Sequence, residues 1–343
     1  MRIAINGFGR IGRCVVRALL ERDRESHLDV VALNSPGDPR VLAHLLKYDS
    51  TYGTLPFDIQ VQPDAILCKK LRITCLNNTS FQMNWRPFNL DLVFECSGKI
   101  RHRETAERHL VAGASRVLIS SPFHDSDVTL IPGCNMQSYR SEKHRIVSMG
   151  SCTTNCLCPT LKVLIENFHV ERGFATTIHS YTGDQRLLDG SHHDLRRARA
   201  AGSSLIPTKT GTSEVLSDIF PQLRGKFSCS AIRAPTSSVS LLELTVETRD
   251  QVDRQSVNQA FIDASKGELR QIIGYSDEPL VSVDYKKDPR SAIVDGLSTA
   301  VNGNLVKVLA WYDNEWAYAT RMLETAEWLG KASLIEESIG SFR

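Results

Sequence analysis

The pattern of apolar and polar positions near the N-terminus predicts a strand, a helix and a second strand in that order. The segment 2–6, with an apolar centre at 3–5, is typical of a buried strand, and a glycine-rich turn follows it at 7–13. Residues 14–22 repeat apolar positions at helical spacing, and the Val- and Leu-rich run 28–33 indicates another strand. Because such a crossover joins parallel strands, this segment predicts a βαβ unit in a parallel sheet.

The same alternation continues to about residue 150. Further strands are expected at 90–95, 117–119 and 145–148, with a helix at 104–112. Strands alternating with helices are typical of a Rossmann-type doubly wound α/β fold. We therefore expect a dinucleotide-binding domain over residues 1–151.

The pattern changes after this point. A long helix is expected at 156–168, with Pro159 in its first turn, where proline is tolerated. A basic, loop-like stretch covers 181–209. Strands are expected at 174–180, 228–233, 238–247, 292–294 and 306–311. This order predicts an α+β catalytic domain over 152–316 with a mixed or antiparallel sheet, and a closing helix, 317–343, that completes the first domain.

Composition narrows the class of protein. The chain has 343 residues, and its 41 basic and 39 acidic residues give a net charge of +2, which favours neither nucleic acid nor an anionic membrane as partner. No apolar run approaches the roughly 20 residues of a membrane span. Nine cysteines without a signal-peptide pattern favour reduced thiols and a cytoplasmic protein. Cys152, Cys156 and Cys158 lack zinc-site spacing, so we expect no metal.

Three glycines form a dinucleotide fingerprint in the required context, after a strand and at the start of a helix. Gly7 permits the tight turn, Gly9 lets a pyrophosphate approach the backbone, and Gly12 allows close packing of helix and strand. The first backbone N–H groups of that helix face the phosphates. A purely structural glycine turn is the alternative.

The residue after the second strand bears on the choice between NAD and NADP. An acidic residue is usual there, but this chain has Ser35. A serine does not repel a 2′-phosphate and its hydroxyl can donate to one, so NADP is admissible and slightly favoured. Alternatively, Ser35 only caps a turn with Pro36, and NAD binds without a carboxylate.

A cysteine at the start of the long helix is the candidate nucleophile. The helix N-terminus is expected to lower the pKa of Cys152 and to favour its thiolate. The alternative is a small buried core residue, a role that suits Cys156 and Cys158 better. His179 ends a predicted strand and is expected to be exposed at the sheet edge, where it would be the base.

Five motifs together resemble the glyceraldehyde-3-phosphate dehydrogenase family, over nearly the whole chain from residue 2 to about 329. They are NGFGRIGR at 6–13, SCTTNC at 151–156, TTIH at 176–179, DLRRARAA at 194–201 and WYDNEW at 311–316. The resemblance implies a homotetramer that oxidises glyceraldehyde 3-phosphate. Cys152 would form a hemithioacetal and then a thioester, His179 would take the proton, and inorganic phosphate would release the acyl phosphate.

The resemblance also implies the binding residues. Those for the substrate phosphate are Thr182 and Arg233, and those for inorganic phosphate are Ser151, Thr153, Thr210 and Gly211, with Arg197 close to both. Those for the cofactor are Gly7, Gly9, Arg10, Ile11, Gly12, Ser35, Ser97, Ser120 and Asn314. At least one arginine of the run 196–199 is expected to be solvated or at a subunit contact.

Some features leave the assignment open. Met149 and Gly150 replace the family's usual Asn-Ala, which is expected to loosen the turn beside Cys152. Erythrose-4-phosphate dehydrogenase, a sister group with the same cysteine and histidine, is the close alternative. The segments 288–296 and 144–148 resemble that group, whereas 276–282 looks like the triose enzymes. An alternative from another class is a catalytically silent NAD(P)-binding regulatory protein.

Overall fold

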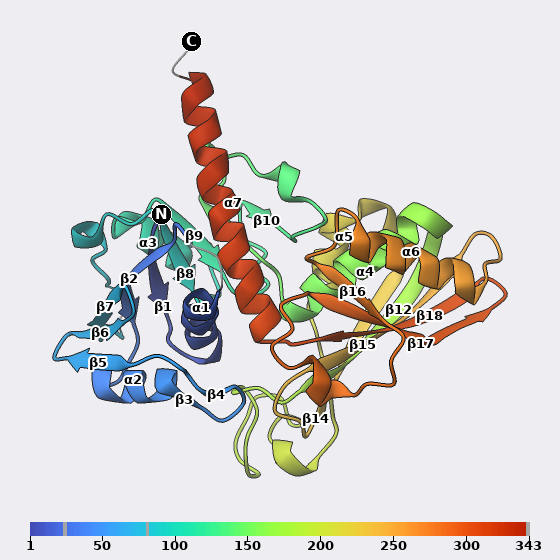
Figure 1. Ribbon diagram of the computed structural model, residues 1–343, viewed down its shortest axis with the longest axis horizontal. Coiled ribbons are helices and arrows are strands. Elements are labelled where there is room, and N and C mark those ends of the chain that lie inside the picture. The colour runs from blue at the N-terminus through green and yellow to red at the C-terminus, as the bar shows by residue number, and fades with distance from the viewer. Residues whose placement is uncertain (23–25, 80–81, 341–343) are drawn as a thin grey trace. The chain divides into compact units, whose positions relative to one another are not determined.

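The structure is a computed structural model that describes residues 1–22, 26–79 and 82–340. The chain forms two compact units (Figure 1). The first consists of residues 1–130, 137–150 and 319–343, and the second of residues 131–136 and 151–318. The short segment 131–136 belongs to the second unit because Ile131 packs in that unit's core. None of the described helices has the length and apolar character of a membrane span.

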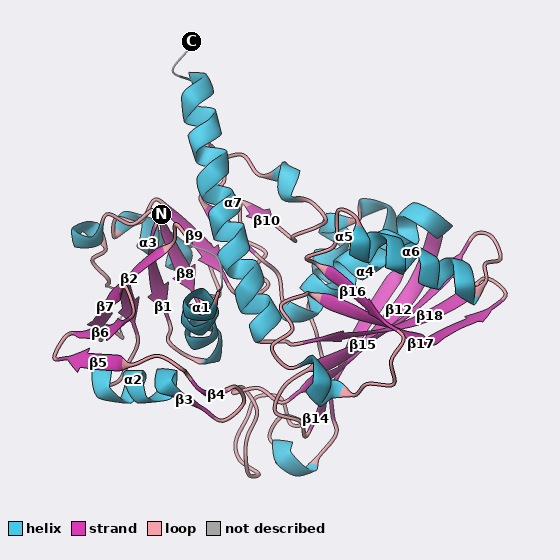
Figure 2. Cartoon of the chain, in the orientation of Figure 1, coloured by secondary structure: helices cyan, strands magenta, loops and turns pink. Residues whose placement is uncertain are grey.

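The first unit is built on a nine-stranded sheet, in the order β10-β11-β9-β8-β1-β2-β7-β6-β5 (Figure 2). Its strands are β1 (Arg2–Asn6), β2 (Asp29–Asn34), β5 (Ile59–Gln62), β6 (Ala65–Cys68), β7 (Leu71–Leu76), β8 (Leu92–Glu95), β9 (Arg116–Ile119), β10 (Val128–Thr129) and β11 (Ile146–Ser148). The pairs from β10 to β7 are parallel, and the β7–β6–β5 edge is antiparallel. The predicted doubly wound sheet is confirmed.

Short helices accompany this sheet. They are α1 (Arg10–Glu21), α2 (Pro39–Lys47), α3 (Arg103–Val111) and the 3₁₀ turns η1 (Arg86–Phe88) and η2 (Met136–Ser138), and a separate hairpin joins β3 (Tyr48–Asp49) to β4 (Gly53–Thr54). Helix α1 begins four residues before the predicted 14–22, directly after Gly9. Its first turn therefore lies within the glycine-rich segment.

The second unit is a seven-stranded mixed sheet, as predicted, in the order β13-β14-β12-β15-β18-β17-β16. Its strands are β12 (Val170–Ser180), β13 (Ile206–Thr208), β14 (Phe227–Ala234), β15 (Ser240–Thr248), β16 (Ile273–Ser276), β17 (Ala292–Asn302) and β18 (Leu305–Tyr312). The helical elements are α4 (Cys152–Phe168), α5 (Thr212–Ile219), α6 (Arg254–Lys266), η3 (Ala201–Ser203), η4 (Pro221–Leu223) and η5 (Ser282–Tyr285). Helices α4, α5 and α6 cover one face of the sheet (Figure 1).

Alternation along the strands shows which face is covered. On β15, Leu242, Leu244 and Val246 are buried in the core with Leu157 and Leu161 of α4. The intervening residues of β15 are only partly buried, because α4, α5 and α6 lie on the other face of the sheet. At one end of this second face, Tyr285 of η5 packs against Ile293 and Trp311. The last helix, α7 (Trp316–Gly340), corresponds to the closing helix predicted over 317–343.

The expected position of Pro159 is wrong. Helix α4 begins at Cys152 rather than at residue 156, so Pro159 lies in the helix interior. The earlier start is set by Ser151, whose side-chain oxygen accepts a hydrogen bond from the Thr154 N–H at 3.1 Å. This cap places Cys152, and not Cys156, in the first position of the helix.

Candidate active site

The turn before α4 presents Cys152 at the helix N-terminus. Gly150 has φ +61°, a left-handed conformation that favours glycine, and its N–H donates to the Ser148 hydroxyl at 3.1 Å. Ser151 and Thr154 then close a capping box. The turn is therefore fixed by a glycine conformation and a cap, contrary to the expected loosening.

The sulfur of Cys152 meets the imidazole of His179. The distance from Sγ to Nε2 is 3.3 Å. His179 lies near the end of β12, which runs between β14 and β15, and it is 4% exposed. The expectation of an exposed histidine is wrong because neighbouring strands flank β12 on both sides. Cys152 itself is partly buried.

Arg233 lies beside the same histidine, because His179 of β12 and Arg233 of β14 are direct register partners. Its Nη1 contacts the His179 Nδ1 and donates to the Ser180 carbonyl at 3.2 Å. Its Nε is buried and has no hydrogen-bond partner among the described residues. A partly buried guanidinium with an unmatched donor is suited to an oxyanion.

The electrostatics of the pair differ from the expectation. Burial raises the pKa of the Cys152 thiol, although Arg233 and the N–H groups of the first helical turn act against this. The prediction of a lowered thiol pKa is wrong, since desolvation outweighs the helix terminus. Burial, together with the charge of Arg233, lowers the pKa of His179 to about 3. The thiol and the imidazole are therefore both neutral near pH 7.

Two tautomers of His179 fit its contacts. If Nδ1 carries the proton, it donates to the Ser180 carbonyl at 2.7 Å, and Nε2 can accept the thiol proton. If Nδ1 instead accepts from Arg233, Nε2 carries the proton and can donate to a thiolate. The arrangement can thus serve both protonation states of the sulfur.

Tyr312 is a site residue that the sequence reasoning missed, although it lies in the quoted motif 311–316. Its hydroxyl is 3.0 Å from the Thr153 hydroxyl and 2.7 Å from the Thr177 hydroxyl. Its ring packs edge-on against His179, with 6.1 Å between centroids. It is buried and joins α4 to β12 directly beneath the reacting pair.

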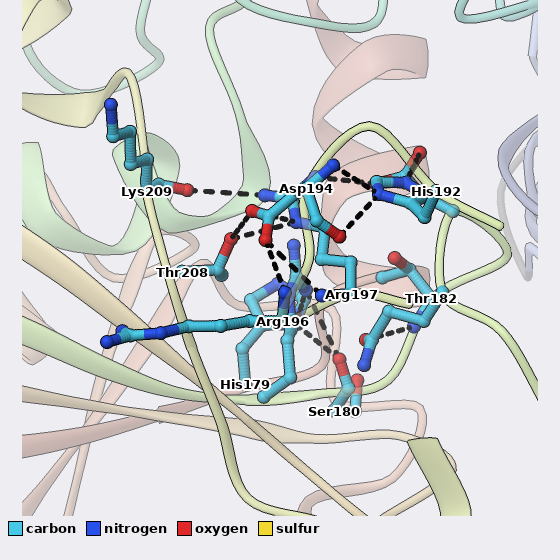
Figure 3. Close-up of polar contacts among 12 residues, drawn as sticks. His179, Ser180, Thr182, His192, Asp194, Arg196, Arg197, Thr208 and Lys209 are labelled. Carbon is cyan, nitrogen blue, oxygen red and sulfur yellow. Dashed lines mark hydrogen bonds and ion pairs between the residues drawn. The ribbon is translucent and has the colours of Figure 1, made fainter. Parts of the chain in front are cut away.

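The basic loop 181–209 holds Arg197 firmly. The Arg197 guanidinium donates to the Thr208 hydroxyl at 2.8 Å and to the Lys209 carbonyl at 3.4 Å (Figure 3). It also pairs with Asp184 at 2.5 Å, a partner that the sequence reasoning did not identify. The backbone N–H of Thr182 donates to Gln185 at 3.2 Å in the same loop.

The other arginines of this run behave differently. Arg196 is exposed, and Arg199 is exposed and pairs with Asp189 at 3.0 Å. Both side chains lie at the surface of the unit. The basic run therefore contains one partly buried, fully engaged arginine, Arg197, and two exposed ones.

The proposed site for inorganic phosphate is only partly assembled. Ser151 serves the helix cap and Thr153 bonds to Tyr312. Thr210 and Gly211 lie at the start of α5, where the Thr210 and Thr212 hydroxyls are 2.7 Å apart. Within the described residues, no hydrogen bond joins these two groups.

The glycine fingerprint borders a pocket of about 210 Å³ in the first unit. The lining residues are Asn6, Gly7, Phe8, Gly9, Asn34, Ser35, Pro36, Asn78, Thr79, Cys96, Ser97 and Lys99. Gly7 has φ +96°, and a side chain there would collide with the backbone of Ser97, whereas Gly9 borders open space. The residues fit a dinucleotide, because the uncapped N-terminus of α1 leaves N–H groups available to phosphates.

Not every predicted cofactor residue lines this pocket. Gly12 packs against Gly7, and Ile11 lies in the first turn of α1. Arg10 pairs with Asp49 at 2.5 Å. Ser120 follows β9 and donates its backbone N–H to the Glu95 carbonyl at 3.0 Å.

Asn314 belongs to the second unit, close to the reacting pair. It is buried, and its side-chain oxygen accepts from Ser180 at 2.9 Å and from Ser240 at 3.1 Å. Because the Ser180 carbonyl also contacts His179, the amide of Asn314 and the imidazole are fixed by the same residue.

The side chains that could act as metal ligands do not lie in a suitable cluster among the described residues. Among residues 1–22, 26–79 and 82–340, no cluster of three or more His, Cys, Asp or Glu is arranged to hold a metal ion. None of the nine cysteines, all of which lie in the described ranges, forms a disulfide.

Comparison with known proteins identifies the family. Residues 1–103 match the family described as "Glyceraldehyde 3-phosphate dehydrogenase, NAD binding domain", and residues 151–314 match its "C-terminal domain". The chain is 45% identical over 336 residues to glyceraldehyde-3-phosphate dehydrogenase 1 of Bacillus cereus, covering 97% of this chain and 99% of the relative. Glyceraldehyde-3-phosphate dehydrogenase 2 of Trichormus variabilis is 46% identical over 330 residues, which cover 95% of this chain and 98% of the relative. A Pseudomonas aeruginosa relative, also named glyceraldehyde-3-phosphate dehydrogenase, is 44% identical over 328 residues, which cover 95% and 97%.

The matched ranges lie in both units and cover the positions of the fingerprint, the cysteine motif and the histidine. They confirm the resemblance inferred from the five motifs. The chain therefore belongs to the glyceraldehyde-3-phosphate dehydrogenase family.

Proposed function

We propose that this chain catalyses the reversible, phosphorylating oxidation of glyceraldehyde 3-phosphate to 1,3-bisphosphoglycerate, with NAD or NADP as hydride acceptor. The observation that carries the proposal is the 3.3 Å approach of the Cys152 sulfur to the His179 Nε2 in a chain of this family. A thiol at a helix start beside a neutral imidazole is equipped for covalent catalysis on an aldehyde.

In the first step, His179 accepts the thiol proton and the Cys152 sulfur attacks the aldehyde carbon. The carbonyl oxygen gains the electron pair and takes up a proton, which gives a hemithioacetal. The N–H groups of the first turn of α4 and the protonated imidazole stabilise the developing oxyanion. Arg233, whose positive charge disfavours the imidazolium, helps His179 to return its proton.

The second step converts the hemithioacetal to a thioester. His179 removes the hydroxyl proton while the C–H bond breaks. The nicotinamide ring, when bound, supplies the acceptor for the hydride. Asn314, fixed by Ser180 and Ser240, is a suitable partner for the carboxamide of that ring.

In the third step, an oxygen of inorganic phosphate attacks the thioester and the Cys152 thiolate leaves. Ser151, Thr153, Thr210, Gly211 and Arg197 are proposed to hold this phosphate. Thr182 and Arg233 are proposed to hold the phosphate of the substrate, and the unmatched Nε of Arg233 supports this role. Asp184 competes with either oxyanion for Arg197.

The cofactor is proposed to be NAD or NADP, bound at the fingerprint pocket through Gly7, Gly9, Ser35 and Ser97. Arg10, Ile11, Gly12 and Ser120 are proposed to contribute at its border. Lys99 is the one charged side chain among the described residues that line the pocket. A pocket with a lysine, a serine and no lining carboxylate favours the admission of a 2′-phosphate.

The assembly is proposed to be a homotetramer in the cytoplasm. The face of the seven-stranded sheet opposite α4 supports self-association, because it exposes Phe174 (66%) and Leu305 (46%). The free cysteines support a reducing compartment.

Initial rates test the proposal. We expect activity with glyceraldehyde 3-phosphate that requires inorganic phosphate and is lost in Cys152→Ser, with Cys158→Ser as the control for loss of an unrelated thiol. Higher activity with erythrose 4-phosphate would replace the substrate by that of the sister group. Binding of NAD without iodoacetamide labelling of Cys152 would instead indicate a silent cofactor-binding protein.

A further inference from the structure

Polar side chains lie at or just after the carboxyl ends of four neighbouring strands in the first unit. Glu95 ends β8, Asn6 ends β1, Asn34 ends β2, and Asn78 follows β7. These strands are adjacent in the order β8-β1-β2-β7. The dinucleotide pocket of an open parallel sheet lies at the carboxyl ends of its strands.

Hydrogen bonds join the four residues into one chain. The Asn6 amide donates to the Glu95 Oε2 at 2.5 Å, and the Asn34 amide donates to the Asn6 oxygen at 2.7 Å. Asn34 also donates to the Asn78 carbonyl at 3.0 Å and accepts from its N–H at 2.8 Å. We call these four residues the polar row.

Two further buried residues hold the Glu95 end of the polar row: His109 contacts Glu95, and Trp85 contacts His109. The Trp85 indole N–H donates to the His109 Nδ1 at 3.1 Å. Because an indole only donates, the His109 proton lies on Nε2, which is 3.0 Å from the Glu95 Oε2. His109 and Trp85 are both fully buried.

Glu95 is the charged member of the polar row and is 2% exposed. Besides Asn6 and His109, the N–H and the hydroxyl of Ser97 donate to its Oε1 at 2.7 Å and 2.5 Å. Burial acts to raise the pKa of Glu95, but hydrogen bonds from His109, Ser97 and Asn6 bring it below its ordinary value. The side chain is therefore an acceptor with four donors around it.

The position of the polar row relates it to the cofactor. Asn6, Asn34, Asn78 and Ser97 all line the 210 Å³ pocket, whereas Glu95 does not. Asn6 and Ser97 are thus each oriented by a hydrogen bond to Glu95, which lies outside the pocket lining, and Asn34 is held in turn by Asn6 and by the Asn78 backbone. Such support fixes binding groups before a ligand arrives.

We infer that Glu95 and His109 are positioning residues that hold the floor of the dinucleotide pocket through Asn6 and Ser97. This rests on the proposed binding of NAD or NADP there. In Glu95→Gln, an NH2 group replaces one of the two carboxylate oxygens. This donor would face other donors, either those of Asn6 and His109 or those of Ser97. His109 has no alternative tautomer to relieve this conflict while Trp85 donates to its other nitrogen.

The test measures NAD binding by isothermal titration calorimetry in the absence of substrate, for Glu95→Gln and Trp85→Phe. Glu95→Gln is expected to raise the Kd for NAD at least tenfold while kcat at saturating NAD stays within about twofold. Trp85→Phe keeps a buried ring and frees the second His109 tautomer, so it is expected to raise the Kd about two- to fivefold.

Val93→Ala is the matched control. Val93 is buried in the same strand as Glu95 but makes no polar contact with the row, so its loss destabilises the unit without reorienting the floor. Its Kd for NAD is expected to match that of the wild type. If Glu95→Gln binds NAD with the wild-type Kd, the inference is overturned. If Glu95→Gln does not fold, a wild-type Kd for NAD in Trp85→Phe overturns it instead. So does an equal loss in Val93→Ala. A wild-type chain that fails to bind either dinucleotide overturns the proposed cofactor instead.

Discussion

Tyr312 is bonded to Thr153, the residue that follows the nucleophile, with 3.0 Å between the two hydroxyl oxygens. The same phenol is 2.7 Å from the Thr177 hydroxyl, two residues before His179. One buried hydroxyl therefore connects the helix that carries the sulfur to the strand that carries the imidazole.

Replacing Tyr312 by phenylalanine should loosen that connection. We expect kcat to fall about tenfold, because small displacements of the reacting groups slow the reaction strongly. We also expect the free energy of unfolding to fall by about 1–2 kcal/mol, because the two threonine hydroxyls lose their partner. Tyr285→Phe is the control, since Tyr285 is another buried tyrosine of the second unit, stacked on Trp311. Equal kcat values for the two variants would contradict a role for Tyr312 in the reacting pair.

Arg233 should matter for the phosphate of the substrate. We expect Arg233→Lys to lower kcat/KM for glyceraldehyde 3-phosphate by about 10- to 100-fold, because lysine keeps the charge but loses the planar fork. Unphosphorylated glyceraldehyde is the control substrate, and its kcat/KM should change far less. The ratio of kcat/KM for the two substrates is independent of any change in Cys152 reactivity, because such a change affects both substrates alike. An unchanged ratio would exclude Arg233 from the substrate's anion site.

The reactivity of the thiol should depend on pH in a definite direction. Burial raises the pKa of Cys152 while Arg233 lowers it, so the thiolate fraction should grow as the pH rises from 6 to 9. We expect iodoacetamide to label Cys152 progressively faster over this range, as followed by mass spectrometry of the adduct. Arg233→Met should shift the profile to higher pH, and a shift to lower pH would contradict the assigned electrostatics.

Stability in mild acid should reveal the buried, neutral state of His179. Its pKa is about 3 in the fold and near 6.5 when unfolded, so the unfolded chain binds the extra proton as the pH falls below 6.5. The folded state therefore loses stability between pH 6.5 and 3, by about 2 kcal/mol at pH 5. His179→Gln should lack this loss. Urea unfolding of both proteins at pH 7 and pH 5 measures the difference, and parallel losses would show that His179 does not titrate in this way.

Cofactor choice should respond to residue 35. Ser35→Asp places a carboxylate at the pocket border, where it would repel a 2′-phosphate and bind ribose hydroxyls. We expect the Kd ratio of NADP to NAD to rise at least tenfold. Lys99→Gln should shift the ratio in the same direction by a smaller factor. The test is calorimetric measurement of the Kd for both cofactors. An unchanged Kd ratio in Ser35→Asp would show that the adenosine ribose does not bind beside residue 35.

The sequence predicted most of what local patterns can encode. The βαβ order, the glycine fingerprint before α1 and the cysteine at the start of α4 each depend on residues close together in the chain. The exact start of α4 was missed because Ser151 and Thr154 form a capping box in which threonine replaces the usual glutamate or glutamine.

Features that depend on tertiary packing were not accessible from the sequence. The burial of His179 follows from its position between β14 and β15, and the raised pKa of Cys152 follows from desolvation. Asp184 and Tyr312 meet Arg197 and Thr153 only in the folded chain, so no spacing signal identified them. The motif WYDNEW did contain Tyr312, and its position two residues before Asn314 was the one usable signal.

The division of the chain has a further consequence for how such a protein can change. The sulfur, the imidazole and the guanidinium of Arg233 all belong to residues 151–318, whereas the fingerprint and the polar row belong to residues 1–150. Substitutions that retune dinucleotide preference therefore need not disturb acyl transfer, and changes in aldehyde specificity need not disturb the dinucleotide site. Cofactor usage and substrate range can therefore evolve separately in this architecture. A change in one of these traits does not require a variant that has lost the other.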